Sequence, residues 1–129
     1  MSEKLHIFAV SDSVGETAEK IAVASVLQFD IERSITRFSR VTKEDQVMQI
    51  IDRAIVEDAI IIYTMVKPQL SEFMEEKARE KGITVVNVMQ PLFKAIQAKT
   101  GQQPSRTIGL THKTDDEYFN RVKAIEYTI

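Results

Sequence analysis

The sequence predicts an α/β fold in which four parallel strands form a sheet flanked by helices. Short runs rich in β-branched residues alternate four times with longer segments whose apolar residues recur at helical spacing. Such alternation is typical of strand–helix–strand units, whose strands are parallel. The third run, residues 59–64, is apolar without polar alternation, as expected for a strand buried on both faces.

The first strand is predicted over residues 5–10, and the first helix from near Val14. The strand segment is short, mostly apolar and rich in strand formers. Ser13 and Glu16 have the three-residue spacing of a capping box, which marks a helix start. The stripe expected on one face of this helix is Ala18, Ile21, Ala22, Ser25 and Phe29.

The next unit pairs an edge strand with a strongly amphipathic helix. Residues 31–39 are more polar and predict an edge strand anchored by Ile35 and Phe38. Thr42 and Asp45 repeat the capping-box spacing, so the helix should begin there. Its apolar stripe is Val47, Ile50, Ile51, Ala54 and Ile55.

Proline and glycine bound the last two helices of the sheet domain. Pro68 suits the first turn of the third helix, and Gly82 is placed to end it. Residues 83–88 predict the fourth strand, after which Pro91 opens the fourth helix and Gly101 stops it. The apolar positions of these helices are Leu70, Phe73, Met74 and Ala78, then Leu92, Phe93 and Ile96.

The predicted strand order is 2-1-3-4, the flavodoxin-like arrangement, because the polar second strand suits an edge. Residues 1–100 would form this domain, and residues 101–113, which contain Gly, Pro, Ser and Gln, a loop or linker. Residues 114–129 predict a C-terminal helix that begins with a third capping-box spacing. This helix ends on apolar Ile129 without a stop signal, which indicates that the chain is a fragment, with a docked C-terminal helix as the alternative.

Composition restricts the class of protein. A chain of 129 residues suits one domain, and 43% apolar with 28% charged residues are typical of globular proteins. The lack of cysteine excludes disulfides, thiol catalysis and cysteine-ligated zinc. A net charge of −2 and a pI near 5.7 argue against a dedicated nucleic-acid binder. No apolar stretch reaches the roughly 18 residues of a membrane span, so we expect a cytoplasmic protein without membrane or nucleic-acid partners.

The loop after the first strand is the strongest candidate site. In open α/β sheets, ligands bind beyond the carboxyl ends of the strands where strand order reverses, here between the first and third strands. The amino terminus of the following helix offers free N–H groups to a phosphate. Asp12 suits a general base or a metal ligand, but a turn-capping role is the preferred interpretation. Ser13 and Gly15 also suit purely structural roles. The candidate phosphate-binding residues are Ser11, Asp12, Ser13, Gly15, Glu16 and Thr17.

Polar residues also follow the later strands. Lys67 suits a phosphate partner, and a solvated surface lysine is its common alternative role. His112 lies in the long loop, where functional residues concentrate. His112 has no His or Cys partner at metal-ligand spacing, so no metal site is predicted. No G-x-x-x-x-G-K-[ST] sequence occurs, which excludes a Walker-type nucleotide loop from this chain. The residues expected to meet at the sheet edge are Thr64, Lys67, Asn87 and Gln90.

Two motifs are specific enough to compare with known families. Residues 10–18 read VSDSVGETA, and residues 112–127 read HKTDDEYFNRVKAIEY, with Pro104 and Gly109 before the second motif. Both motifs, at this separation, resemble the pyruvate, phosphate dikinase regulatory protein family, which also includes regulators of phosphoenolpyruvate synthetase. The resemblance covers nearly the whole chain.

The resemblance implies a bifunctional serine/threonine kinase and pyrophosphorylase. Such an enzyme inactivates the dikinase by phosphorylating a threonine with ADP, and reactivates it by attack of inorganic phosphate, which releases pyrophosphate. The family's nucleotide-binding motif would lie beyond Ile129, so this chain resembles an N-terminal half, expected to be inactive alone and to hold no cofactor. The implied partners are pyruvate, phosphate dikinase or phosphoenolpyruvate synthetase and the C-terminal half, with a homodimer left open.

Two other classes stay open on the residues alone. An FMN-binding, flavodoxin-like electron carrier has a similar phosphate loop after its first strand, but Trp is absent here and Tyr63 lies within a strand. A non-catalytic interaction domain would instead dock on a partner through the helix predicted at 114–129.

Overall fold

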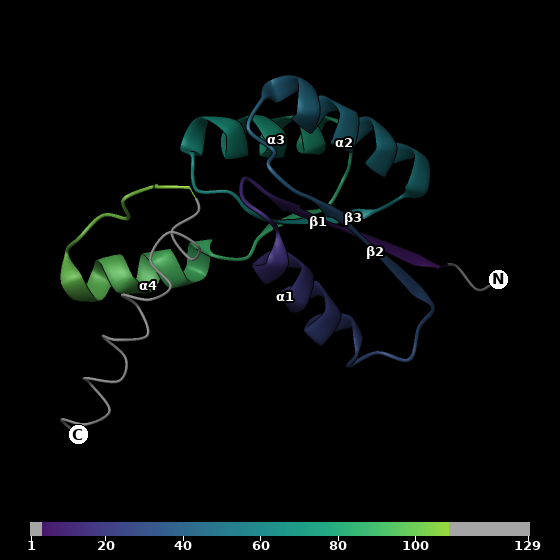
Figure 1. Cartoon of the computed structure of the whole chain (residues 1–129), viewed down its shortest axis with the longest axis horizontal. Helices are drawn as coiled ribbons and strands as arrows, with labels where there is room; N and C mark the ends of the chain where they lie inside the picture. Colours follow the sequence, from purple (N-terminus) through teal and green to yellow (C-terminus); the bar gives the residue numbers. More distant parts are fainter. Residues whose placement is uncertain (1–3, 109–129) are drawn as a thin grey trace.

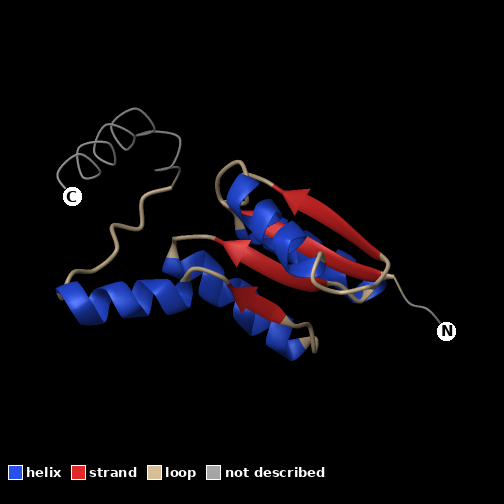
Figure 2. Cartoon of the chain, turned by 90° about the horizontal axis from the view of Figure 1, so that it is seen from below, coloured by secondary structure: helices blue, strands red, loops and turns tan. Residues whose placement is uncertain are grey.

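The computed structural model describes residues 4–108 and contains four strands and four helices in strict alternation. All strand pairs are parallel, and the strand order is β2-β1-β3-β4, which confirms the predicted fold class and topology (Figures 1 and 2). The helix predicted at 114–129 lies outside the described residues. The elements are β1 (Leu5–Ser11), α1 (Glu16–Val26), β2 (Arg33–Phe38), α2 (Glu44–Glu57), β3 (Ile60–Thr64), α3 (Pro68–Glu80), β4 (Val85–Asn87) and α4 (Gln90–Thr100).

The helices cover the two faces of the sheet unequally. α2 and α3 lie over one face, whereas α1 lies over the other (Figure 1). Because side chains alternate along a strand, Phe8 and Val10 of β1 face α2 and α3, and Ile7 and Ala9 face α1. β1 therefore contributes to both cores, as its central position between β2 and β3 requires.

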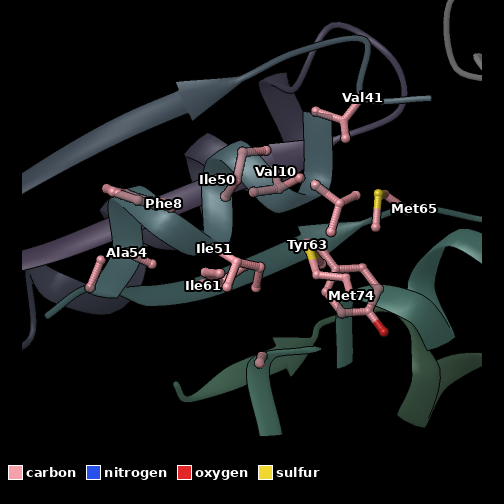
Figure 3. Close-up of a cluster of buried hydrophobic side chains, with 13 residues drawn as sticks. Phe8, Val10, Val41, Ile50, Ile51, Ala54, Ile61, Tyr63, Met65 and Met74 are labelled. Atoms are coloured by element: carbon pink, nitrogen blue, oxygen red, sulfur yellow. The ribbon is translucent and has the colours of Figure 1, made fainter. Parts of the chain in front are cut away.

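The larger core fills the space between the sheet and the α2–α3 pair. Phe8 and Tyr63 are fully buried in it, and the stripe of α2 packs down onto them (Figure 3). The predicted α2 stripe is confirmed for Val47, Ile50, Ile51 and Ala54. Ile55 differs, because 46% of its surface stays exposed at the edge of the stripe.

The beginning of α1 differs from its sequence prediction. The helix begins at Glu16, and its N-cap is Gly15 in the left-handed conformation, without a side-chain cap. Ser13 therefore forms no capping box. Its backbone N–H donates to the Ser11 hydroxyl oxygen at 3.0 Å, which holds the chain in a turn before the helix.

The buried face of α1 is also narrower than predicted. It consists of Ala18, Ala22 and Val26, spaced four residues apart. Ile21 and Phe29 are 36% and 63% exposed, so their placement in the buried stripe was wrong. The helix ends at Val26, so helical spacing no longer applies to Phe29.

The predicted start of α2 is off by one residue. The N-cap is Lys43, and Gln46 rather than Asp45 completes the cap. The Gln46 side-chain oxygen accepts the backbone N–H groups of Thr42 and Lys43, at 2.8 and 3.0 Å. Gln is a preferred residue at this third helical position, which explains why the longer side chain makes the contacts.

The third and fourth helices begin as expected, with a proline in the first turn of each. β4 is shorter than the predicted 83–88 and pairs with β3 over three residues. α4 buries none of its residues and extends beyond the sheet in both views (Figures 1 and 2). Gly101 ends it in the left-handed conformation, with φ of 70°.

Candidate functional site

A cavity of about 310 Å³ opens at the carboxyl ends of β1 and β3, where the strand order reverses. Its walls come from the loops after β1, β2 and β3, from the first turns of α2 and α3, and from the segment after α4. This is the position at which the sequence predicts a ligand site. The lining residues are Asp12, Val41, Thr42, Glu44, Lys67, Gln69, Leu70 and Ile108.

Asp12 is the buried acidic group of the cavity, with only 6% of its surface exposed. Its Oδ2 atom accepts the backbone N–H of Val66 at 2.8 Å. Burial raises the pKa of Asp12 above its ordinary value of 3.8, and the hydrogen bond from Val66 and the charge of Lys67 oppose that rise. The Asp12 carboxylate thus binds the loop after β3, and a hydrogen bond to its own backbone N–H also opposes the rise in its pKa.

The two serines of the first loop make internal contacts instead of lining the cavity. The Ser11 hydroxyl accepts the Ser13 backbone N–H, and the Ser11 and Ser13 carbonyls accept N–H groups from Val41 and Arg40, at 2.9 and 2.7 Å. The Ser39 hydroxyl donates to the Val14 carbonyl at 2.6 Å. These bonds join the loop after β1 to the loop after β2, so the serines fix the wall of the site.

The amino terminus of α1 lies outside the cavity lining. Gly15 has φ of 90°, and the Arg37 side chain packs across it, 3.1 Å from where a Cβ would stand. Arg37 also pairs with Glu19 of α1, its Nη1 atom 3.1 Å from Oε1. Glu16 and Thr17, the first two residues of α1, are exposed. The sequence-predicted phosphate residues therefore divide between two places, with only Asp12 in the cavity.

Among the residues predicted at the sheet edge, only Lys67 lines the cavity. Thr64 is nearly buried at the end of β3, opposite Ser11 in the sheet register. Asn87 instead binds the start of α4, where its Oδ1 atom accepts the backbone N–H groups of Met89 and Gln90, each at 3.2 Å. Gln90 is the exposed first residue of α4. His112 lies outside the described residues.

The sequence reasoning missed several residues that the structure brings to the site. Three of them lie after a parallel strand, before or in the first turn of the next helix: Thr42, Glu44 and Gln69. Their place after a strand could have identified them as candidates. No feature of the sequence indicated that Arg106 would lie near the site. Its Nη1 atom donates to the Val66 carbonyl at 3.3 Å, and its guanidinium lies 5.3 Å from the centre of the Phe93 ring.

A second buried polar cluster lies beneath α3. The fully buried Tyr63 donates its hydroxyl to a Glu75 carboxylate oxygen. Burial raises the pKa of Tyr63, and the Glu75 carboxylate raises it further, so the phenol stays protonated and keeps donating. The nearby side chains of Ser71 and Asn87 oppose this rise in the pKa of Tyr63.

Within residues 4–108, no group of three or more His, Cys, Asp or Glu side chains could hold a metal ion. In the same part of the chain, every helix is too short or too polar to span a bilayer.

A family model described as kinase/pyrophosphorylase matches residues 7–129, nearly the whole chain. The chain belongs to the kinase/pyrophosphorylase family. A relative from Syntrophomonas wolfei, named as a pyruvate, phosphate dikinase regulatory protein, is 74% identical over 98% of this chain and 46% of its own length. Similarly named relatives from Desulfitobacterium hafniense and Clostridioides difficile are 39% and 35% identical, over 95% and 98% of this chain. The chain spans about half the length of these kinase/pyrophosphorylase relatives, 45% and 46% of the latter two.

Proposed function

We propose that the chain is the part of a kinase/pyrophosphorylase that carries a phosphate subsite at the cavity between β1 and β3. The whole enzyme would phosphorylate a serine or threonine of pyruvate, phosphate dikinase, or of phosphoenolpyruvate synthetase, with ADP. It would remove that phosphate with inorganic phosphate and release pyrophosphate. Membership of the family and the names of its relatives support this reaction class.

The main support for the phosphate subsite is the presence of a lysine in the cavity. Lys67 lines it, and no carboxylate among residues 4–108 lies within 4.0 Å of its ammonium group. Gln69 and Leu70 lie in the first turn of α3, where backbone N–H groups have no acceptor within the helix. An ammonium group and free N–H groups are the donors that a phosphate requires.

The size of the cavity is consistent with a small ligand, and within its lining Lys67 stands beside two acidic residues, Asp12 and Glu44. Its volume of about 310 Å³ lies at the small end of ligand pockets, which span about 300–1,000 Å³. Phosphoryl transfer depends on positioning phosphate groups and stabilising their charge, so a fixed phosphate subsite serves both reactions. The flavodoxin-like alternative is not supported, since no aromatic residue is among the described residues that line the cavity.

Calorimetric titration with inorganic phosphate tests the subsite. We expect the chain to bind phosphate, and Lys67→Ala to weaken binding by about 10- to 100-fold, the value of a charge-assisted hydrogen bond. Lys94→Ala, which removes an exposed lysine on α4, is the matched control and should bind as the unchanged chain does.

Thr17→Ala separates the cavity from the amino terminus of α1. Binding that is lost in Thr17→Ala and kept in Lys67→Ala would move the subsite to α1 and contradict its assignment to the cavity. A chain that binds no phosphate would contradict a subsite in this half altogether. Incubation with ADP and purified dikinase should give no phosphorylated dikinase, because this chain carries no Walker-type loop.

A further inference from the structure

The backbone of Val66 is held from both sides. Its N–H donates to the Asp12 carboxylate at 2.8 Å, and its carbonyl accepts from the Arg106 guanidinium at 3.3 Å. Asp12 follows β1, whereas Arg106 follows α4, so two distant segments converge on one residue. Val66 directly precedes Lys67, the lysine of the cavity. The orientation of the Lys67 backbone therefore depends on both contacts.

Arg106 adopts a conformation that its own side chain disfavours. Its φ is 62°, in the left-handed region that residues other than glycine rarely occupy. Such a conformation persists where surrounding contacts over-determine it. The contacts here are the hydrogen bond to Val66 and the stacking over Phe93 of α4. Arg106 thus ties the returning chain to the loop after β3.

The same returning segment completes the cavity. Ile108, two residues after Arg106, is one of its lining residues. The Arg106 contact therefore fixes both a wall of the cavity and the residue before its lysine. On the opposite side, Asp12 is buried in the cavity lining and directs Oδ2 at the Val66 N–H.

We propose that Asp12 and Arg106 are positioning residues, which hold Val66 from opposite sides so that Lys67 faces the cavity. This inference rests on the phosphate subsite proposed above. Asp12 acts as a hydrogen-bond acceptor in this role, not as a base or a phosphate ligand. Asparagine keeps a side-chain oxygen acceptor at the same place, and lysine keeps a cationic donor in place of the guanidinium.

The test is an NMR titration of the ¹⁵N-labelled chain with inorganic phosphate, followed at the amides of Lys67, Gln69 and Leu70. We expect Arg106→Ala and Asp12→Ala each to raise the dissociation constant about two- to tenfold, the value of one hydrogen bond. Arg106→Lys should recover part of the loss. Asp12→Asn should bind within about twofold of the unchanged chain, because its amide oxygen still accepts the Val66 N–H.

The matched control is Arg79→Ala, which removes an exposed arginine on α3 and the same net charge as Arg106→Ala. Equal weakening by both substitutions would assign the effect to net charge and overturn the positioning role. Failure of Asp12→Asn to rescue Asp12→Ala would also overturn it, since the carboxylate itself would then be required. Weakening by Arg106→Ala that Arg106→Lys partly recovers would support it even where Asp12→Ala does not fold.

Failure of this inference can be distinguished from failure of the subsite. If Lys67→Ala abolishes phosphate binding while Arg106→Ala and Asp12→Ala bind normally, the subsite stands and the positioning role falls. If Lys67→Ala binds phosphate like the unchanged chain, the subsite is wrong, and the positioning role falls with it.

Discussion

Asp12 and Val66 lie in loops that follow different strands, and a hydrogen bond of 2.8 Å joins the carboxylate of one to the backbone N–H of the other. The bond spans the point at which the strand order reverses. It also places an acidic group in a site where burial disfavours its charge. The free-energy cost of burying the Asp12 carboxyl group in the folded protein therefore depends on pH.

The stability of Asp12→Asn relative to the unchanged chain should rise as the pH rises from acidic to neutral. Burial raises the pKa of Asp12 above 3.8, so the folded state binds a proton more tightly than the unfolded state. The resulting contribution to stability is fully present below pH 3.8 and is lost as the pH rises through the raised pKa. Asp12→Asn does not titrate, so its free energy of unfolding should increase relative to the unchanged chain over this range.

Urea unfolding at a series of pH values measures that difference. A stability difference that stays constant with pH, or that increasingly favours the unchanged chain as the pH rises, would contradict the raised pKa. Ser2→Ala, in a segment outside the described residues, provides a non-titrating control for the preparation.

Gly15→Ala should destabilise the protein by about 1–2 kcal/mol, the cost of the left-handed conformation for a residue with a Cβ atom. The new Cβ would also lie 3.1 Å from Cγ of Arg37. The double variant Gly15→Ala/Arg37→Ala separates the two effects, because it removes the contact and keeps the backbone cost. Urea unfolding of the unchanged chain, the two single variants Gly15→Ala and Arg37→Ala, and the double variant gives both values, and a neutral Gly15→Ala would show that φ relaxes there.

Tyr63→Phe should lower the free energy of unfolding by about 1–2 kcal/mol. The substitution keeps the buried ring and removes the hydroxyl that donates to Glu75, leaving the carboxylate without this donor. A double-mutant cycle with Glu75→Ala, which removes the acceptor, isolates the pair. A coupling energy of zero would mean that solvent satisfies Glu75 equally well.

Asn87→Ala should loosen the first turn of α4 while leaving the sheet intact. The side chain caps Met89 and Gln90, and loss of such a cap costs about 1 kcal/mol. Because α4 buries no residue, packing does not compensate for that loss. The Cα chemical shifts of α4 should move toward coil values, and Asn87→Asp should restore them. Unchanged shifts in Asn87→Ala would contradict the capping role.

The sheet could be predicted from the sequence because the pattern of apolar and polar residues in each strand reflects how deeply that strand is buried. Residues 59–64 lack polar alternation, and β3 accordingly lies between β1 and β4 with both faces covered. The second strand is more polar, and β2 accordingly lies at the edge of the sheet, where its exposed residues remain in contact with solvent. Strand order follows from these two observations together with the handedness of the crossovers.

The start of α1 and the partners of the site residues could not be predicted in this way. The spacing of Ser13 and Glu16 fits a cap, but contacts of the Ser13 carbonyl with the loop after β2 decide the local conformation. Asp12 binds a residue 54 positions away, and Arg106 one 40 positions away. Local spacing contains no information about such distant partners. Lys67 could be identified because a residue that directly follows β3 lies at the site whatever its partners are.

The short edge strand β4 and the exposed helix α4 should open separately from the rest of the described residues, 4–108. β1 is bonded on both sides and buried on both faces, so its amide protons should exchange with solvent only through global unfolding. β4 contributes three residues and α4 no buried side chain, so their amides should exchange through a local opening of lower free energy. This opening would break the pairing of β4 with β3 and leave α3 in place, because Met74 and Ala78 of α3 belong to the larger core.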